Sequence, residues 1–348
     1  MKKNIFKLHF LVLSILLIIG CSKSSSPSAV IPPVVPPVVP PVATIPVAKL
    51  LSLPSGWKLS TLITAGFPDG VELYFFDSIY SGRKTKMFCL AFNPKSPLIE
   101  FKPVLSATAK KLSDFNRDET GRVLACMNGG YFGANQSFSL VKYNGANVLS
   151  ANIKILNRVF NGASTAYYPT RAAFGINNTG DPSTAWIYHV GTGNDLIYQY
   201  PTPNLNAEGS APRPIPSETF PVGATIWNIN SAIGGSPMLL RNGNNNITSV
   251  EELISISNTT SRPRSALGYT NNNIVVLLVV EGDNPNAGYD GMNLVELAGS
   301  LKALGCTNAI NLDGGGSSSM IAGNQLLNKP GDNGVERSIV SAILIKQK

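Results

Sequence analysis

Short apolar runs recur along the chain from about residue 80 onwards, and clusters of Gly, Pro, Asn and Asp separate them. Their length and their content of β-branched and aromatic residues are typical of strands. The pattern predicts strands at Lys86–Phe92, Ile99–Leu105, Val123–Met127, Ala266–Thr270, Ile274–Val280, Ala309–Leu312 and Ile339–Ile345. The Pro- and Asn-rich stretch 191–223 is expected to be a long loop.

One segment has the periodicity of a helix instead. Apolar residues recur there at a spacing of three and four, which places them on one helix face, at Leu294, Leu297, Ala298, Leu301 and Leu304. Asn293 and Glu296 form a predicted capping box, and Gly305 suits the position after the helix. A second, weaker helix is expected over Thr108–Asn116. Few helices and many strands predict an α+β fold, a single domain with a mixed, mostly antiparallel sheet.

The first twenty residues have the composition of a targeting segment. Three lysines precede an apolar core at 8–19, and the length and flanks fit a secretory signal better than a spanning helix. The tetrad Ile18-Ile19-Gly20-Cys21 resembles a bacterial lipobox, after which the cysteine carries lipid and becomes the mature N-terminus. A non-lipidated signal or an uncleaved anchor is the alternative.

A proline-rich stretch follows Cys21. Its Pro/Val repeat at 32–42 favours extended polyproline geometry, so it would hold a folded domain away from a membrane surface. We therefore divide the chain into a lipoprotein signal at 1–20, a lipidated cysteine and linker at 21–49, and a folded domain at 50–348. The expected location is the bacterial cell envelope, with the protein lipid-anchored at the outer membrane and facing the periplasm.

Charge and residue counts exclude several function classes. The formal net charge is +8, but only 14% of residues are charged and no basic run occurs, so we expect no nucleic-acid partner. Outside the signal, His189 is the single histidine, and its strand-like surroundings favour a structural or surface role over a Ser-His-Asp triad. Cofactor-binding fingerprints are absent from the sequence, and no cofactor is expected.

The cysteines also argue against a zinc site. After Cys21, three remain, Cys89, Cys126 and Cys306, with no C-x-x-C spacing. Cys89 and Cys126 either pair in an oxidising compartment or are buried free thiols.

The run Asn311-Leu-Asp-Gly-Gly-Gly-Ser317 lies between two apolar runs and predicts a sharp turn. Three successive glycines permit positive φ, so consecutive N–H groups can form an anion-binding nest with Asp313 at its edge. The alternative is an ordinary glycine and serine loop. Other polar groups also stand at strand ends, where loops can assemble a site: Asn128, Tyr131, Arg264, Glu281, Asp283, Glu336 and Arg337.

Six motifs occur in the order seen in a known enzyme family: Asn128-Gly-Gly-Tyr-Phe132, Gly234-Gly-Ser-Pro237, Arg262-Pro-Arg-Ser-Ala-Leu-Gly268, Leu294-Val-Glu-Leu-Ala298, Asn311-Leu-Asp-Gly-Gly-Gly-Ser317 and Glu336-Arg337. The sequence thereby resembles the phosphodiester glycosidases over about residues 80–346. The resemblance implies hydrolysis of a sugar-1-phosphodiester, from a carbohydrate or glycan substrate, to a free sugar and a phosphomonoester. It departs from the family pattern in the longer segment 281–290 and in Ser338.

The resemblance also implies roles for individual residues. A phosphomonoester is a weakly basic leaving group, so charge-stabilising donors should matter more than a strong general acid. We assign Arg264 and Arg337 to the phosphate, because the guanidinium fork binds it bidentately. Asp313 is the first candidate for nucleophile or base, and Glu281 or Asp283 the second. The predicted substrate-binding residues are Asn128, Tyr131, Asn311, Gly314, Gly315, Gly316, Ser317 and Glu336.

Two readings without catalysis stay open at this point. The domain could be a glycan-binding lipoprotein that keeps the fold, which predicts binding without turnover. It could also be an assembly factor for exopolysaccharide, in which the glycine run only shapes a turn.

Overall fold

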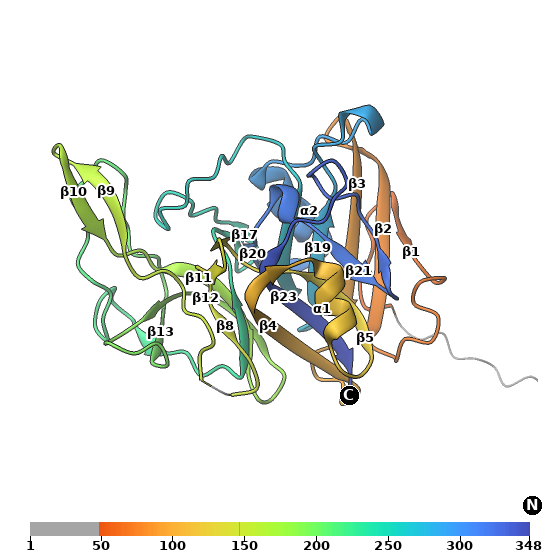
Figure 1. Cartoon of the computed structure of the whole chain (residues 1–348), viewed down its shortest axis with the longest axis horizontal. Helices are drawn as coiled ribbons and strands as arrows, with labels where there is room; N and C mark the ends of the chain where they lie inside the picture. Colours follow the sequence, from red (N-terminus) through yellow and green to blue (C-terminus); the bar gives the residue numbers. More distant parts are fainter. Residues whose placement is uncertain (1–48, 146) are drawn as a thin grey trace, which may run out of the picture. The chain divides into compact units, whose positions relative to one another are not determined.

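The computed structural model describes residues 49–145 and 147–348, which belong to one compact unit (Figure 1). The expected signal, Cys21 and the Pro/Val repeat lie outside the described residues. Within the described part, no helix is long and apolar enough to cross a membrane.

Antiparallel strands form three larger sheets and two hairpins within this part of the chain. The eight-stranded sheet has the order β1 (Trp57–Leu59), β2 (Val71–Tyr80), β3 (Arg83–Phe92), β19 (Val275–Val280), β18 (Arg264–Thr270), β20 (Cys306–Asn311), β16 (Met238–Arg241) and β17 (Asn244–Asn245). The five-stranded sheet has the order β22 (Gln325–Leu326), β21 (Met320–Ala322), β5 (Val123–Asn128), β23 (Ile339–Gln347) and β4 (Ile99–Lys110).

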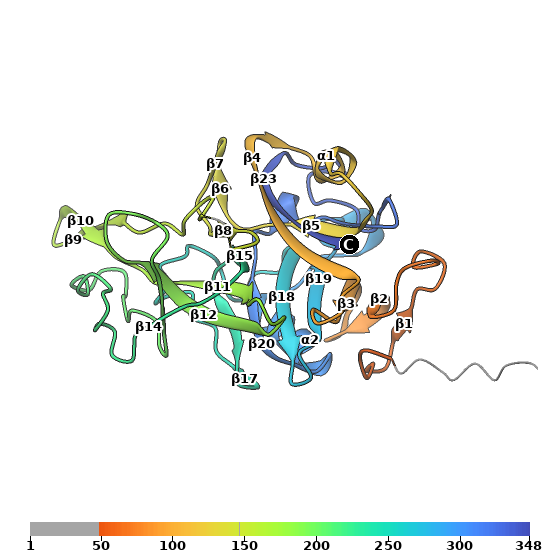
Figure 2. The same ribbon diagram turned by 90° about the horizontal axis from the view of Figure 1, so that it is seen from below.

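The third sheet has six strands and stands beside the other two (Figure 2). Its order is β14 (Thr225–Ile226), β13 (Ile197–Tyr200), β12 (Pro182–His189), β11 (Arg171–Ile176), β15 (Ser231–Gly234) and β8 (Val141–Lys142). The hairpins are β9 (Leu156–Phe160) with β10 (Ala163–Tyr167), and β6 (Phe132–Gly133) with β7 (Gln136–Ser137).

The three sheets share one apolar core. Leu277 of the first sheet, Met127 of the second and Phe174 of the third belong to the same buried cluster. On β19 the alternate residues Val276, Leu278 and Val280 point to a second cluster on the other face. Because both faces of this strand are buried, its sequence is a continuous apolar run.

Helix α2 (Leu294–Ala303) covers that second face, with Leu294, Leu297 and Leu301 in the same cluster as the sheet residues. Its predicted capping box is confirmed, because Asn293 Oδ1 accepts a bond from the Glu296 amide at 2.9 Å and Glu296 Oε2 accepts one from the Asn293 amide at 3.0 Å. Gly305 follows the helix with φ of +90°, as the predicted cap requires.

Asn293→Ala should lower the free energy of unfolding by about 1 kcal/mol, because it removes the acceptor for the first turn of α2. Val295→Ala is the matched control on the same turn, since Val295 is 51% exposed, and it should change stability by less than about 0.5 kcal/mol. Urea unfolding followed by circular dichroism measures both. Equal stability of the two variants would contradict the capping role.

The predicted strands are all present, although their ends differ by a few residues. The weaker helix is displaced: α1 spans Leu112–Asp118, because residues 108–110 extend β4, where Lys110 pairs with Ile339 of β23. The expected long loop at 191–223 contains β13. The remaining helical turns are η1 (Pro285–Ala287) and η2 (Gly315–Ser317).

Candidate functional site

Strand ends from all three sheets meet around one cavity of about 430 Å³. Arg264 opens β18, Arg171 opens β11, Tyr131 follows β5, and Asp313 follows β20. Residues 253–256, Arg158 of β9, Arg262, Gly314 and Gly315 complete the wall. The cavity is therefore lined by three predicted site residues with ionisable side chains, Asp313, Arg264 and Tyr131, which come from separate parts of the chain.

Arg264 is a buried cation without a carboxylate partner. Its side chain is fixed by main-chain acceptors, with Nε donating to the Met292 carbonyl at 3.0 Å and Nη2 to the Thr260 carbonyl at 2.9 Å. Among the described residues, no carboxylate lies within 4.0 Å of its guanidinium nitrogens. Burial lowers its pKa, so the fold holds this charge at an energetic cost. A buried, preoriented guanidinium beside a cavity is suited to an anionic ligand.

Asp313 is the one carboxylate among the described residues that line the cavity. Burial raises the pKa of its carboxyl, while the Ser317 hydroxyl, the Gly314 amide at 2.9 Å and the charge of Arg337 counteract part of that effect. Gly314, the residue after Asp313, lies close to Arg264, since a Cβ atom added to this glycine would be 4.0 Å from Arg264 Nη1. The cavity thus contains one partly desolvated carboxylate and one desolvated cation.

The glycine run does not form the expected nest of free amides. The Gly314 amide donates to Asp313, the Gly315 amide to the Pro263 carbonyl at 2.9 Å, and the Ser317 and Ser318 amides to carbonyls within the turn. Gly315 has φ of +59°, and Gly316 packs against Asp332, so the glycines serve a tight turn. The two glycine amides at the cavity wall, those of Gly314 and Gly315, are thus engaged, and the donors left for an anion there are arginine side chains.

Three predicted substrate-binding residues form hydrogen bonds with other residues around the cavity, so their side-chain donors are already engaged. Asn128 is buried, donates to the Asp313 carbonyl at 2.8 Å and accepts from Ser265 at 2.6 Å. Asn311 is also buried and donates to Tyr131 Oη at 2.8 Å. Tyr131 Oη in turn donates to the Ser236 carbonyl at 2.7 Å. This network fixes the Asp313 backbone and leaves the Tyr131 ring at the cavity wall.

The two alternative carboxylates lie away from the cavity lining. Glu281 is buried, accepts from the Asn284 side chain and the Lys329 amide at 3.0 Å each, and pairs with Lys86 at 3.4 Å. Asp283 pairs with Arg262 at 3.5 Å. Their oxygens are engaged by neighbours, which leaves Asp313 as the carboxylate with access to a ligand.

Arg337 and Glu336 also stand outside the cavity lining. The Arg337 fork donates two bonds of 2.8 Å to Asp332, and the arginine side chain is 44% exposed. Its charge still lowers the pKa of Asp313, so it acts on the site from a distance. Glu336 accepts from the Ser113 amide at 2.9 Å and thereby holds the start of α1.

His189 has the expected structural role. It is buried, with one ring nitrogen accepting from the Asn152 amide at 3.1 Å and the other 2.7 Å from the Asn194 carbonyl. Burial lowers its pKa to about 4, so it is neutral at pH 7. Cys89, Cys126 and Cys306 are buried free thiols. Among the described residues, no group of three or more His, Cys, Asp or Glu side chains is arranged to hold a metal ion.

Sequence reasoning missed the cavity arginines Arg171 and Arg158. A signal for Arg171 existed, because Arg171-Ala-Ala-Phe-Gly175 has the same residue pattern as Arg264-Ser-Ala-Leu-Gly268. Both segments open a strand with a buried arginine at its first position. The two arginines thus reach the cavity from equivalent strand positions in two sheets.

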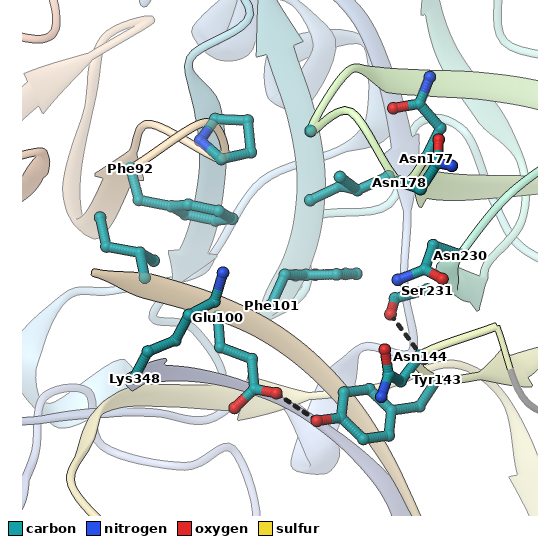
Figure 3. A pocket seen from close by; sticks show the side chains of 14 residues that line it. Phe92, Glu100, Phe101, Tyr143, Asn144, Asn177, Asn178, Asn230, Ser231 and Lys348 are labelled. Atoms are coloured by element: carbon teal, nitrogen blue, oxygen red, sulfur yellow. Dashed lines mark hydrogen bonds between the residues drawn. The ribbon is translucent and has the colours of Figure 1, made fainter. Parts of the chain in front are cut away.

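A second, smaller cavity of about 170 Å³ lies elsewhere, between Phe92, Phe101 and several asparagines (Figure 3). Its carboxylate, Glu100, is bonded to the Tyr143 hydroxyl. None of the residues predicted from the sequence to carry the chemistry lines it, and neither does any arginine of the described chain. A wider cavity of about 620 Å³, beside Phe138 and Ile153, is lined by no carboxylate or arginine of the described chain. The cavity at Arg264 and Asp313 is therefore the candidate active site.

The family profile described as phosphodiester glycosidase matches residues 121–346, well over half of the chain. The chain belongs to the phosphodiester glycosidase family. The matched region includes Asp313, Arg264 and Tyr131, so the candidate active site lies within the family domain. No match was found among the curated proteins.

Solved structures share the fold of this member of the family. One is the catalytic domain of zebrafish N-acetylglucosamine-1-phosphodiester alpha-N-acetylglucosaminidase auto-inhibited by its pro-peptide, with a TM-score of 0.52 and 19% identity over 84% of this chain and 89% of that chain. Another is a hypothetical protein from Synechocystis, with a TM-score of 0.54 and 21% identity over 81% of this chain. The match spans 63% of the length of the Synechocystis chain.

The surroundings of the two predicted phosphate arginines predict unequal effects. Arg264→Lys should lower kcat/KM by about 100-fold or more, because lysine keeps the charge but loses the fork and the carbonyl contacts that aim it. Arg337→Lys should lower it by less than about tenfold, since Arg337 acts on Asp313 only through its charge. Steady-state kinetics with melting curves tests this. The reverse order of effects in folded variants would contradict the assignment of Arg264.

Proposed function

We propose that this phosphodiester glycosidase is a hydrolase that cleaves the sugar C1–O bond of a sugar-1-phosphodiester. The observation that carries the proposal is the buried Arg264, which has no carboxylate partner among the described residues and lines the same cavity as its single carboxylate, Asp313. One group suits the phosphate and the other the attacking oxygen. The zebrafish relative's name supports the same reaction class.

The proposed reaction follows from this pairing. Asp313 takes a proton from water as the water oxygen bonds to C1, and the C1–O bond breaks with its electron pair going to the phosphate oxygen. The products are a free sugar and a phosphomonoester, whose negative charge Arg264 stabilises as it develops. The leaving group needs little protonation, so a second carboxylate is not required as an acid.

A single cavity carboxylate also favours inversion at C1. A retaining mechanism would use Asp313 as the nucleophile and would then need another group to activate water for the second step. Among the described residues lining the cavity, no second carboxylate is available for that purpose. The first-formed anomer, read by NMR during turnover, should therefore have the configuration opposite to that of the substrate.

The experiment that tests the activity is a screen of the full-length protein, in detergent, against a panel of sugar-1-phosphodiesters. Release of both free sugar and phosphomonoester supports the proposal. Binding of the diesters without turnover would favour the alternative of a glycan-binding lipoprotein, and no binding would favour an assembly role in exopolysaccharide production.

We also propose that the enzyme works on glycan or exopolysaccharide at the bacterial cell envelope, held to the membrane by a lipid on Cys21. The lipobox-like tetrad and the Pro/Val repeat support this proposal. Cys21→Ala should release the protein from the membrane fraction or block its processing, as measured by fractionation and mass spectrometry of the N-terminus. Unchanged membrane association with an unmodified N-terminus would contradict lipidation.

A further inference from the structure

Two arginines converge on one carbonyl oxygen at the cavity wall. Arg171 Nη2 donates to the Leu253 carbonyl at 3.1 Å, and Arg158 Nη2 lies 3.5 Å from the same oxygen. Like charges held this close repel each other, and the charge of Arg158 lowers the pKa of Arg171. An anion bound between the two guanidinium groups would offset this repulsion.

Arg171 has unused donor capacity. Its side chain is 6% exposed, and its Nε has no hydrogen-bond partner among the described residues. Burial lowers its pKa, and a buried guanidinium N–H without an acceptor adds a desolvation cost. The residue lines the cavity, so a ligand there can supply the missing acceptor.

The residue whose carbonyl oxygen contacts both arginines has a strained backbone. Leu253 has φ of +50°, a left-handed conformation that bulky residues rarely adopt. Strained residues of this kind gather at ligand sites, where surrounding contacts hold them in place. Here the strained residue supplies the carbonyl that positions both guanidinium groups.

Nearby carboxylates only partly compensate these charges. Glu208 approaches Arg158 Nε at 3.7 Å, but the glutamate side chain is 71% exposed and its attraction is screened. The charge of Glu252 supports the protonated form of Arg171. However, its two oxygens accept bonds from five other donors, and it lies beyond ion-pair distance of the arginine.

The pair belongs to the same cavity as the proposed catalytic groups. Tyr131 lines this cavity together with Arg264 and Arg171. Burial raises the pKa of its phenol, and the charges of the two arginines counteract part of that effect. Arg158 is on the β9–β10 hairpin, which extends beyond β11 and β12 at one end of the domain in both views (Figures 1 and 2). A ligand on Arg264 can therefore continue past Tyr131 towards the hairpin.

We propose that Arg158 and Arg171 form a second anion-binding subsite, which takes a carboxylate or phosphate group of the substrate in addition to the phosphodiester on Arg264. This proposal rests on the proposed function, and it narrows the substrate class to sugar phosphodiesters with a second anionic group. That group belongs either to an acidic sugar or to a further phosphate.

Isothermal titration calorimetry on the full-length protein in detergent tests the subsite without any need for turnover. The probes are N-acetylglucosamine 1-phosphate with one anionic group, glucuronic acid 1-phosphate with an added carboxylate, and inorganic pyrophosphate with an added phosphate. Arg158→Ala is the test variant because Arg158 is only partly buried, and Arg122→Ala, an exposed arginine of another surface, is the matched control.

The wild-type protein and Arg122→Ala should bind at least one doubly anionic probe about tenfold more tightly than N-acetylglucosamine 1-phosphate. Arg158→Ala should lose most of that preference, and the probe affected identifies the source of the second group. Equal weakening of all three probes, or no preference in the wild type, would overturn the subsite. If the diester screen shows no turnover while Arg158→Ala still loses the preference, the hydrolase proposal fails and the subsite stands.

Discussion

Asp313→Asn should reduce kcat by about 10³-fold or more while the protein stays folded, if Asp313 is the base that activates water. Asparagine is almost isosteric and can still accept the bond from the Gly314 amide. It cannot accept a proton in the reaction. Because the other described residues lining the cavity include no second carboxylate, no neighbour can take over the role.

The pH profile of the wild-type enzyme should carry the signature of the same residue. Burial raises the pKa of the Asp313 carboxyl, so the ionised base forms only at a pH above the ordinary aspartate range of about 3.9. The value of kcat/KM should therefore fall as the pH drops through this raised pKa. Arg337→Ala should move the acid limb higher still, since the Arg337 charge favours ionised Asp313.

Stability should change in the opposite direction to activity. A carboxyl whose folded-state pKa is raised destabilises the native protein once the pH exceeds its unfolded pKa, and the cost is fully present above the folded pKa. Asp313→Asn removes that cost. The variant should melt at a higher temperature than the wild type near pH 7, and the difference should shrink as the pH falls towards 4.

Asp283→Asn is the comparison variant, because Asp283 stands at a nearby strand end and does not itself line the cavity, although it pairs with the wall residue Arg262. It should keep activity within about tenfold, in keeping with a partly exposed ion pair. Full activity of a well-folded Asp313→Asn protein would remove Asp313 from the mechanism. A large loss in Asp283→Asn alone would move the role to the segment after β19.

The parts of the fold that follow from local pattern were predictable from the sequence. The continuous apolar run of β19 predicts a strand that is buried on both faces, and the leucine spacing of α2 predicts a helix with one buried face. The Asn293–Glu296 capping box predicts where that helix begins. The end of β4 was not predictable in this way. Residues 108–110 are polar enough for a helix start, but pairing with β23 keeps Lys110 in the strand.

The site was predictable only where chemistry and strand ends coincide in sequence. Asp313 and Arg264, which line one cavity in the structure, could be proposed from the sequence because each adjoins an apolar strand within a distinct motif. The predicted nest of free glycine amides is not formed. A glycine run permits several kinds of turn, and the partner of the Gly315 amide, the Pro263 carbonyl, lies on a segment distant in sequence. Arg337 was predicted to bind the phosphate, whereas its guanidinium donates two hydrogen bonds to Asp332. The loop conformation that brings these two side chains together has no signal in the local sequence.

Glu252 had no sequence signal, and yet it connects the elements that form the cavity. It is fully buried, and its oxygens accept bonds from the Ala172 and Met238 amides at 2.9 and 2.8 Å. The hydroxyls of Ser236 and Thr248 donate at 2.6 Å each, and Trp186 Nε1 donates at 3.0 Å. These donors belong to β11, β12, β16 and the turns beside them, so one carboxylate joins the first sheet to the third.

Glu252→Ala should therefore lower the free energy of unfolding by about 3–5 kcal/mol, a large fraction of the stability of a typical domain. The reason is that five buried donors lose their acceptor together, and each unsatisfied group retains its desolvation cost. Glu252→Gln should cost less, about 2 kcal/mol, because one oxygen remains while the new amide N–H₂ faces donors. Urea unfolding measures both.

The neighbouring residue provides the control. Glu251→Ala removes a carboxylate that is not fully buried and has no hydrogen bond or ion pair among the described residues, so it should change stability by less than about 0.5 kcal/mol. Glu252→Gln should also weaken binding of anionic ligands, because the Ala172 amide adjoins Arg171 and the Ser236 carbonyl accepts from Tyr131. A Glu252→Ala protein as stable as Glu251→Ala would mean that the carboxylate is not what joins the two sheets at the cavity.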